Sequence, residues 1–402
     1  MSYRGNAGWR KSVLAASAAV ITTALLMAPS AADAATGDVW SVVNSPNVTT
    51  GTLSTNSLLS VAAVSDTDVW AVGLESKTGF NLSGAFPLIE HWNGTAWSVS
   101  LTGTQNAVLT SVSADAANDA WAVGNVVSSQ SLLAEHWNGS AWRSVTMPMP
   151  TGAISARVEG VTALSAGNAW AVGKFSTNDL TLPLIEHWDG VRWSVVPNVP
   201  RQVSDSNVLH AITAVSADDI WAVGEFDQGG VSPHSPLLMH WNGTAWSLSQ
   251  PAVLNQGESN GFPVAVTAVS GNDVWAVGGV GVTSPDGTSS SQQPFAIHWD
   301  GTRWAEVATP APATPSAAFA FTGVTALSPN DVWGVGNNAG RAFVEHWDGS
   351  SWSTSGTPAL GARGNTLEGI TRSGTTSMWA VGDNNPTSGL ITQTLTLHAT
   401  NG

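Results

Sequence analysis

A tryptophan motif that recurs at long intervals is the feature that most limits what this chain can fold into. The motif W-x-V-G occurs seven times, with 46 to 58 residues between successive copies. Repeats of this length are typical of solenoids and propellers, in which each small unit buries its apolar surface against its neighbours. The motif begins at Trp70, Trp121, Trp170, Trp221, Trp275, Trp333 and Trp379.

A second motif, H-W-[ND]-G-x-x-W, follows the first in six of the seven repeats. The seventh repeat stops after its third strand, at residues 395–398, and lacks a fourth strand with its tryptophan. A matching fourth strand stands at the other end of the chain, since residues 38–43 resemble residues 191–196, the fourth strand of the third repeat. We therefore predict that the N-terminal strand, which contains Trp40, completes the last unit and closes a ring. The paired tryptophans are Trp92 and Trp97, Trp137 and Trp142, Trp188 and Trp193, Trp241 and Trp246, Trp299 and Trp304, and Trp347 and Trp352.

Each repeat contains four short runs that are rich in Val, Ile, Leu, Thr and Trp and bounded by Gly, Asn, Asp and Ser, which indicates four β-strands. In the first repeat these runs are residues 58–64, 69–74, 87–92 and 96–100. No run after residue 34 has the period of a helix. The sequence predicts an all-β fold, a seven-bladed β-propeller with four antiparallel strands per blade.

Two of the four connections in each repeat are short and constant. The first two strands join through S-x-x-[DN], and the last two through Asn-Gly or Asp-Gly, for which we expect φ > 0 at both central residues. The other connections vary: residues 74–85 and 279–293 are long, and residues 310–315 are rich in Pro. A meander puts the constant connections on one face of the disc and the variable ones on the other. We expect ligand recognition on the variable face.

The N-terminus predicts export. Arg4, Arg10 and Lys11 precede an apolar run, and residues 32–34 read A-D-A, so residues 1–34 are predicted to be a signal peptide and residues 35–402 the propeller. Cleavage after Ala32 or Ala35 and a retained anchor are the alternatives. Loss of residues 1–34 removes three basic residues and one acidic residue, so the formal net charge of −15 becomes −17. This charge argues against nucleic acid and anionic lipid as partners, and no later stretch is apolar enough to span a membrane.

The sequences D-V-W-A-V-G and H-W-N-G-T-x-W resemble the Trp-rich repeats of secreted bacterial β-propellers and are similar in cadence to tectonin-type lectin repeats. The resemblance covers residues 36–402, although these units are longer than tectonin repeats. It implies binding of a glycan or cell surface without catalysis. Kelch repeats fit less well, because paired glycines occur only at Gly229-Gly230 and Gly278-Gly279 and not once per repeat. The G-H and W-D landmarks of WD40 repeats are not in register here.

The histidines and tryptophans of the template have mainly structural interpretations. One histidine per repeat stands in the third strand, so these side chains cannot converge on one metal ion, and we expect each to bond the polar S-x-x-[DN] turn. Glu90, Glu135, Glu186 and Glu345 precede four of these histidines and are expected to share that role. The tryptophans either pack between blades or, as an alternative, stack on sugar rings at repeated inter-blade pockets. The histidines are His91, His136, His187, His240, His298, His346 and His398.

Most enzyme classes are excluded by missing residues. There is no P-loop, G-x-S-x-G or H-E-x-x-H motif. The chain has no Cys, and Tyr3, its one Tyr, leaves with the signal peptide, which excludes a sialidase nucleophile and a Cys–Tyr copper cofactor. A lyase that uses a histidine base would have only His210 and His234, which lie outside the template. A hydrolase with paired carboxylates stays open, because no sequence spacing tests it.

Polar residues that break the template are the candidate ligand-binding residues. The residue eleven positions before each W-x-V-G tryptophan is not constant, and we expect it at the variable-face mouth of the central channel. The residue directly after W-x-V-G varies as well. A Ca²⁺ ion held by Glu225, Asp227 or Asp383 has no ligand-spacing motif in support, so we predict no cofactor and no metal site. The predicted ligand-binding residues are Glu159, His210, Glu368, Lys174, Phe175, Glu225, Phe226, Asn337 and Asp383.

Together these observations predict a secreted, extracellular binding module rather than an enzyme, with lectin-like recognition of glycans or cell surfaces through the variable face. The alternative is a protein-interaction scaffold that uses the same face. A third alternative is a glycan-active hydrolase with Glu159 and Glu368 in the channel.

Overall fold

The structure is a computed structural model that describes residues 40–79, 84–227, 234–249, 258–283, 290–310, 319–360, 364–385 and 391–400. The predicted signal peptide, parts of the longer variable loops and the Pro-rich segment 311–315 lie outside these residues. The elements of the described part are all β-strands. Within the same part, no helix is long and apolar enough to cross a membrane.

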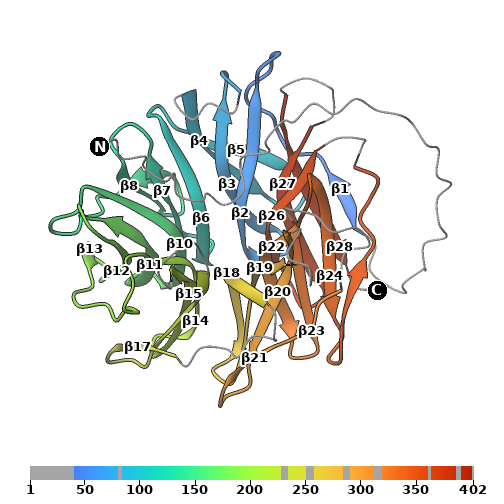
Figure 1. The fold of residues 1–402 in the computed structure, drawn as a ribbon. Coiled ribbons are helices and arrows are strands. Elements are labelled where there is room, and N and C mark those ends of the chain that lie inside the picture. Colours follow the sequence, from blue (N-terminus) through green and yellow to red (C-terminus); the bar gives the residue numbers. More distant parts are fainter. Residues whose placement is uncertain are drawn as a thin grey trace.

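The strands form seven four-stranded antiparallel sheets, which confirms the predicted seven-bladed β-propeller (Figure 1). The innermost strands are β2 (Thr55–Ser65), β6 (Ala107–Ala116), β10 (Ser155–Ser165), β14 (Asn207–Ser216), β18 (Glu258–Ser270), β22 (Phe319–Ser328) and β26 (Asn365–Arg372). The second strands are β3 (Asp68–Ser76), β7 (Asp119–Val126), β11 (Asn168–Ser176), β15 (Asp219–Asp227), β19 (Asp273–Thr283), β23 (Asp331–Asn338) and β27 (Ser377–Asn384).

The third strands are β4 (Ala85–Trp92), β8 (Ser131–Trp137), β12 (Thr181–Trp188), β16 (His234–Trp241), β20 (Ser290–Trp299), β24 (Arg341–Trp347) and β28 (Gln393–Thr400). The outer strands are β5 (Trp97–Thr102), β9 (Trp142–Ser144), β13 (Trp193–Val195), β17 (Trp246–Leu248), β21 (Trp304–Glu306), β25 (Trp352–Ser355) and β1 (Ser41–Val43). We number the blades 1 to 7 from β2–β5 to β26–β28, and write the junction of blades 4 and 5 as 4/5.

The ring closes through the N-terminal strand, as predicted. β1 pairs antiparallel with β28 (Figure 1). Ser41 lies opposite His398 in this pairing. The innermost strands contact one another in order around the ring, and β26 of blade 7 contacts β2 of blade 1. The outer strand of blade 7 therefore comes from the start of the chain, so the two ends of the propeller are held in one sheet.

Every innermost strand contains a β-bulge at the same place, next to the glycine of W-x-V-G. In blade 4, Leu209 pairs with Gly224 and Ala211 with Val223, so His210 is the extra residue. A Cβ on Gly224 would lie 2.0 Å from a backbone carbonyl oxygen of β14, which leaves no room for any side chain. The motif glycine is therefore required by a close backbone approach. The equivalent separations are 2.0–2.2 Å at Gly73, Gly124, Gly173, Gly278, Gly336 and Gly382.

The Asn-Gly and Asp-Gly hairpins form where predicted, but by a different turn. Only the glycine has positive φ, 91° at Gly94, whereas Asn93 does not. The Asn93 side chain instead accepts hydrogen bonds from the backbone N–H groups of Thr95 and Ala96, both 3.0 Å. The prediction of two positive φ values is wrong because the Asn93 side chain closes a longer loop by accepting two N–H groups.

Tryptophans join each blade to the next. The W-x-V-G tryptophan lies edge-on to the outer-strand tryptophan of the following blade, with centroids 5.0–6.1 Å apart and rings inclined by 70–89°. At six junctions the tryptophan of the H-W motif adds a third ring, 4.8–5.2 Å from the first. Junction 6/7 lacks this ring because Ala399 follows the histidine of blade 7. The packing interpretation is confirmed for the buried rings.

The template histidines bond the turn, as predicted. In blades 1 to 6 the Nε2 atom lies 2.5–3.0 Å from the Asp or Asn that ends the turn between the first two strands, which reads S-x-x-[DN] in every one of these blades except blade 2, where Ala116 replaces the serine. Each imidazole also packs on the W-x-V-G tryptophan of its own blade, with centroids 4.1–4.5 Å apart. The histidine thus fixes the tryptophan against the turn.

The glutamates before the histidines do not share this role, and that prediction is wrong. Successive residues of a strand point to opposite faces, so these side chains enter the opposite junction. Glu186 is fully buried, and neither of its carboxylate oxygens has a hydrogen-bond partner among the described residues. Burial raises the pKa of Glu186 to about 8. Burial raises the pKa of Glu90 and Glu345 to about 8 as well.

We predict that Gly224→Ala destabilises the propeller by more than about 3 kcal/mol, because the new Cβ would collide with the backbone of β14. Thermal unfolding measures the effect. The control is Gly167→Ala, whose Cβ would have no atom within 4 Å. Equal melting temperatures for the two variants would contradict the role given to the motif glycine.

We predict that Glu186→Gln stabilises the protein at alkaline pH. Because the folded-state pKa of about 8 lies above the ordinary 4.5, the folded state holds a proton that the unfolded chain releases. The stabilisation that protonated Glu186 contributes is complete below pH 4.5 and is lost as the pH rises toward 8. The variant should melt about 3–6 °C higher than the wild type at alkaline pH and at the same temperature in acid. A constant difference across pH would contradict a neutral buried carboxyl group.

Candidate functional site

The bulge of each innermost strand presents the variable residue that we singled out eleven positions before the W-x-V-G tryptophan. At two bulges the side chain reaches the next blade: Thr110 donates to the carbonyl of Val158 (2.9 Å), and Thr322 to that of Leu367 (2.6 Å). The bulge position therefore lies at the joint between neighbouring innermost strands. The seven bulge residues are Leu59, Thr110, Glu159, His210, Val264, Thr322 and Glu368.

Blade 4 brings the off-template charged residues together. His210 Nε2 lies 3.6 Å from Glu225 Oε1, and His234 Nδ1 lies 3.5 Å from Glu225 Oε2. The same Nδ1 atom is 2.8 Å from Asp227 Oδ1, in an orientation that makes no hydrogen bond. We call His210, Glu225, Asp227 and His234 the blade 4 cluster. His210 and Glu225 are two of the predicted ligand-binding residues.

Glu225 stays ionised in this cluster. Desolvation by burial alone would raise its pKa, but the hydrogen bond and charge of His210, with the charges of His234 and Lys174, outweigh it. The pKa of Glu225 therefore lies below its ordinary value. Lys174 belongs to blade 3, so its charge acts on Glu225 from the neighbouring blade.

The remaining predicted residues do not join this cluster. The Asn337 Oδ1 atom accepts the N–H of Gly340 (2.7 Å), which closes a turn. Asp383 accepts hydrogen bonds from Ser57 (2.8 Å) and Thr366 (3.1 Å), and burial raises its pKa to about 6. These two side chains bond the protein itself.

The other four predicted residues lie on strands of blades 3, 4 and 7. Phe175 and Phe226 are partly buried and pack on the apolar clusters that join blades 2 and 3 and blades 3 and 4. Glu159 and Glu368 occupy the bulges of blades 3 and 7, which are not neighbours in the ring, and Glu368 is buried. Within the described ranges, no group of three or more His, Asp or Glu side chains could hold a metal ion.

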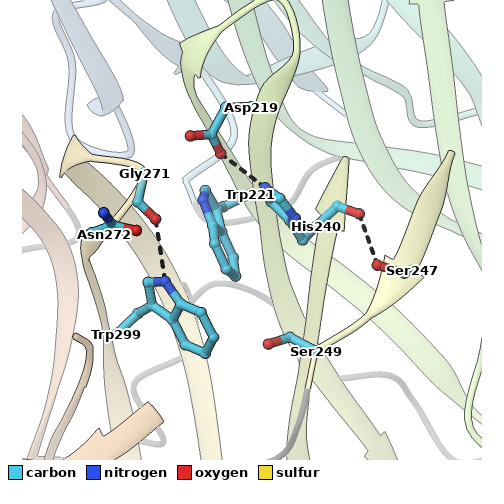
Figure 2. Close-up of a pocket in the computed structure, with 8 residues that line it drawn as sticks. All are labelled: Asp219, Trp221, His240, Ser247, Ser249, Gly271, Asn272 and Trp299. Carbon is cyan, nitrogen blue, oxygen red and sulfur yellow. Dashed lines mark hydrogen bonds and ion pairs between the residues drawn. The ribbon is translucent and has the colours of Figure 1, made fainter. Parts of the chain in front are cut away.

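A pocket of about 490 Å³ opens at junction 4/5 (Figure 2). It is lined by Asp219, Trp221, His240, Ser247, Ser249, Gly271, Asn272 and Trp299. These residues come from the S-x-x-[DN] turns, from the second strand β15, from the ends of the third strands β16 and β20, and from the outer strand β17 and the residue after it. The pocket therefore opens at the constant-turn end of the blades, not on the variable face.

The ring of Trp299 is the platform of this pocket. Its indole N–H donates to the carbonyl of Gly271 (3.2 Å), which fixes the ring, and its centroid lies 5.2 Å from that of buried Trp221 (Figure 2). The indole is only partly buried, so part of it faces the pocket. Asp219, bonded to His240 (2.9 Å), and exposed Asn272 add polar groups beside it. The pocket combines one aromatic surface with hydrogen-bonding groups.

We expected recognition on the variable face, and none of the residues that line this pocket is among the predicted ligand-binding residues. The alternative interpretation of the tryptophans, stacking on sugars at inter-blade pockets, requires a partly exposed ring in such a pocket, and Trp299 is one. One feature of the sequence could have indicated this pocket. Gly271 stands in the turn of blade 5 where the turns of blades 2, 3 and 4 carry Ala117, Ala166 and Ala217.

Comparisons with known proteins support the fold alone. No protein-family model and no curated protein matches the chain. Among solved structures, it is similar to YCF48 bound to D1 peptide, with 16% identity, a TM-score of 0.53 and coverage of 90% of this chain and 97% of that one. YCF48 from Cyanidioschyzon merolae is 15% identical, with a TM-score of 0.52 and coverage of 90% and 98%.

An ulvan lyase of polysaccharide lyase family PL25, bound to a GlcA–Rha3S saccharide, is 11% identical with a TM-score of 0.52 and covers 83% of this chain and 90% of that one. The similar structures thus include one bound to a peptide and one bound to a saccharide. All share the propeller architecture with this chain.

We predict that Glu225→Gln destabilises the protein at neutral pH by about 1–3 kcal/mol, because it removes the charge that His210, His234 and Lys174 face. Because the folded-state pKa of Glu225 is lowered, the ionised carboxylate stabilises the fold at pH values above its ordinary pKa, and this stabilisation disappears as the pH falls through the folded-state pKa. The stability lost in Glu225→Gln should therefore vanish in acid, whereas Glu186→Gln differs from the wild type only at alkaline pH. Melting curves across pH, with Glu159→Gln as control, measure it. An unchanged melting temperature at neutral pH would contradict the cluster.

Proposed function

We propose that the protein is a secreted, lectin-like binding module that holds a saccharide in the pocket at junction 4/5. The observation that carries this proposal is the partly exposed ring of Trp299 in a pocket that also presents Asp219 and Asn272. The C–H face of a pyranose stacks on an aromatic ring, while its hydroxyl groups need polar partners at the edge. A pocket of about 490 Å³ is within the usual range for small-molecule sites.

The fixed orientation of Trp299 favours binding. Its ring is held by the hydrogen bond to Gly271 and by contact with Trp221, so little side-chain freedom is lost when a ligand stacks on it. The proposal that the protein is exported rests on its N-terminal sequence. The resemblance to lectin-type repeats supports the proposal that it binds a saccharide.

A protein partner on the variable face is the second candidate function. The blade 4 cluster supports it, since His210, Glu225 and His234 are polar groups that the template does not require. The peptide bound to the similar YCF48 structure is consistent with such a role. Catalysis is a competing interpretation, because one of the similar structures is a polysaccharide lyase. We propose a non-enzymatic module because Glu159 and Glu368, the candidate pair of carboxylates, lie on blades that are not neighbours in the ring.

We predict that the mature protein binds saccharides on a glycan array and that Trp299→Ala lowers the affinity more than tenfold. The matched control is Trp241→Ala, which removes the equivalent ring and the equivalent hydrogen bond to a turn carbonyl (3.1 Å) at junction 3/4. Titration calorimetry measures both variants. Binding to no saccharide, or equal loss in the two variants, would contradict the proposed site.

A further inference from the structure

The combination of residues at two positions distinguishes junction 4/5 from the other junctions, although six of the seven junctions carry the same three tryptophans. The first position is that of Gly271, in the turn of the following blade. The second is that of Ser249, three residues after the outer-strand tryptophan of the preceding blade. Both residues line the pocket, and both are small.

Gly271 leaves room for the carboxylate of Asp219. A Cβ on Gly271 would lie 2.2 Å from Asp219 Oδ2, so this oxygen occupies space that a side chain would take. The Oδ1 atom of Asp219 is held by His240, 2.9 Å away (Figure 2). Junctions 1/2, 2/3 and 3/4 have Ala at this position, 5/6 has Pro329, and 7/1 has Asp66, which accepts a hydrogen bond from Ser373 (2.9 Å).

Ser249 leaves room on the opposite side of the pocket. Its Oγ accepts the indole N–H of Trp304 (3.1 Å), whereas the N–H groups of the six equivalent tryptophans have no hydrogen-bond partner among the described residues. Four junctions carry a larger, apolar valine here, and only 1/2 and 6/7 also have serine. The valines are Val43, Val145, Val196 and Val307.

Only junction 4/5 has the platform tryptophan, the glycine and the serine together. Junction 6/7 lacks the tryptophan, and at 2/3 Trp188 is buried, with 8% of its surface exposed. Junction 1/2 differs from 4/5 at one of the two positions, since it has Ser100 and Trp137 but Ala117 in place of glycine.

We infer that the ring has one open saccharide site, at junction 4/5, that Gly271 and Ser249 keep it open, and that it selects neutral saccharides. This inference rests on the proposed function. The lining contains the carboxylate of Asp219 and no Lys or Arg, in a chain of formal net charge −15. A carboxylate accepts hydrogen bonds from sugar hydroxyls, whereas it repels a uronate or a sulfate.

Calorimetric titration tests the inference with cello-, xylo-, manno- and chito-oligosaccharides, and with oligogalacturonate as the acidic counterpart. We expect one equivalent of a neutral oligosaccharide per chain and no binding of oligogalacturonate. Gly271→Ala and Ser249→Val, which install residues that other junctions carry, should each lower the affinity more than tenfold. The matched controls are Gly167→Ala and Ser100→Val. Ala117→Gly should open junction 1/2 and raise the stoichiometry from one to two.

These titrations distinguish a failure of the proposed function from a failure of the single site or of its selectivity. Binding of no saccharide by the wild type contradicts the proposed function. Binding of several equivalents, or of one equivalent that survives both Gly271→Ala and Ser249→Val, contradicts the single site and leaves the proposed function standing. Tighter binding of oligogalacturonate contradicts the selectivity for neutral saccharides. Melting curves of the variants, expected to match the wild type, confirm that each is folded.

Discussion

The contact on which the ring depends is the edge-on packing of one blade's W-x-V-G tryptophan against the outer-strand tryptophan of the next. It occurs at all seven junctions, and it buries the first of these rings to 0–4% exposure. Other repeated residues position this contact. The histidine packs on the W-x-V-G ring, and the Asp or Asn of the turn bonds the histidine. The motif glycine allows the backbone carbonyl of the innermost strand to approach closely. A change in any of these residues alters a junction between blades.

Sequence alone predicts the parts of this arrangement that repeat. The blade count, the closure by β1 and the bond between His240 and Asp219 follow from residues whose spacing is constant, since each blade needs them. Glu186 was misjudged because its neighbour in sequence, His187, faces the other junction. The signal was present, since blades 4, 5 and 7 carry Met239, Ile297 and Leu397 at the same position, all fully buried. A position filled by Met, Ile and Leu is an apolar one.

The site was harder to predict than the fold because its residues come from two blades. Ser249 and Gly271 are 22 residues apart in sequence, and neither is unusual within its own repeat. Their combination with Trp299 becomes visible only when blade 5 is placed beside blade 4. The blade 4 cluster was more accessible to sequence analysis, since His210 and Glu225 visibly depart from the template. The β-bulge that presents His210 lies beside the motif glycine Gly224, which marks a close backbone approach but does not by itself fix the strand register.

The central claim is that a saccharide binds at junction 4/5 on a tryptophan that also holds the blades together. A crystal structure of residues 35–402 soaked with a neutral oligosaccharide tests it most directly. The account predicts a pyranose ring stacked on Trp299, with a hydroxyl group within hydrogen-bond distance of the Asp219 carboxylate. A saccharide bound only beside His210 and Glu225, with junction 4/5 vacant, would contradict it.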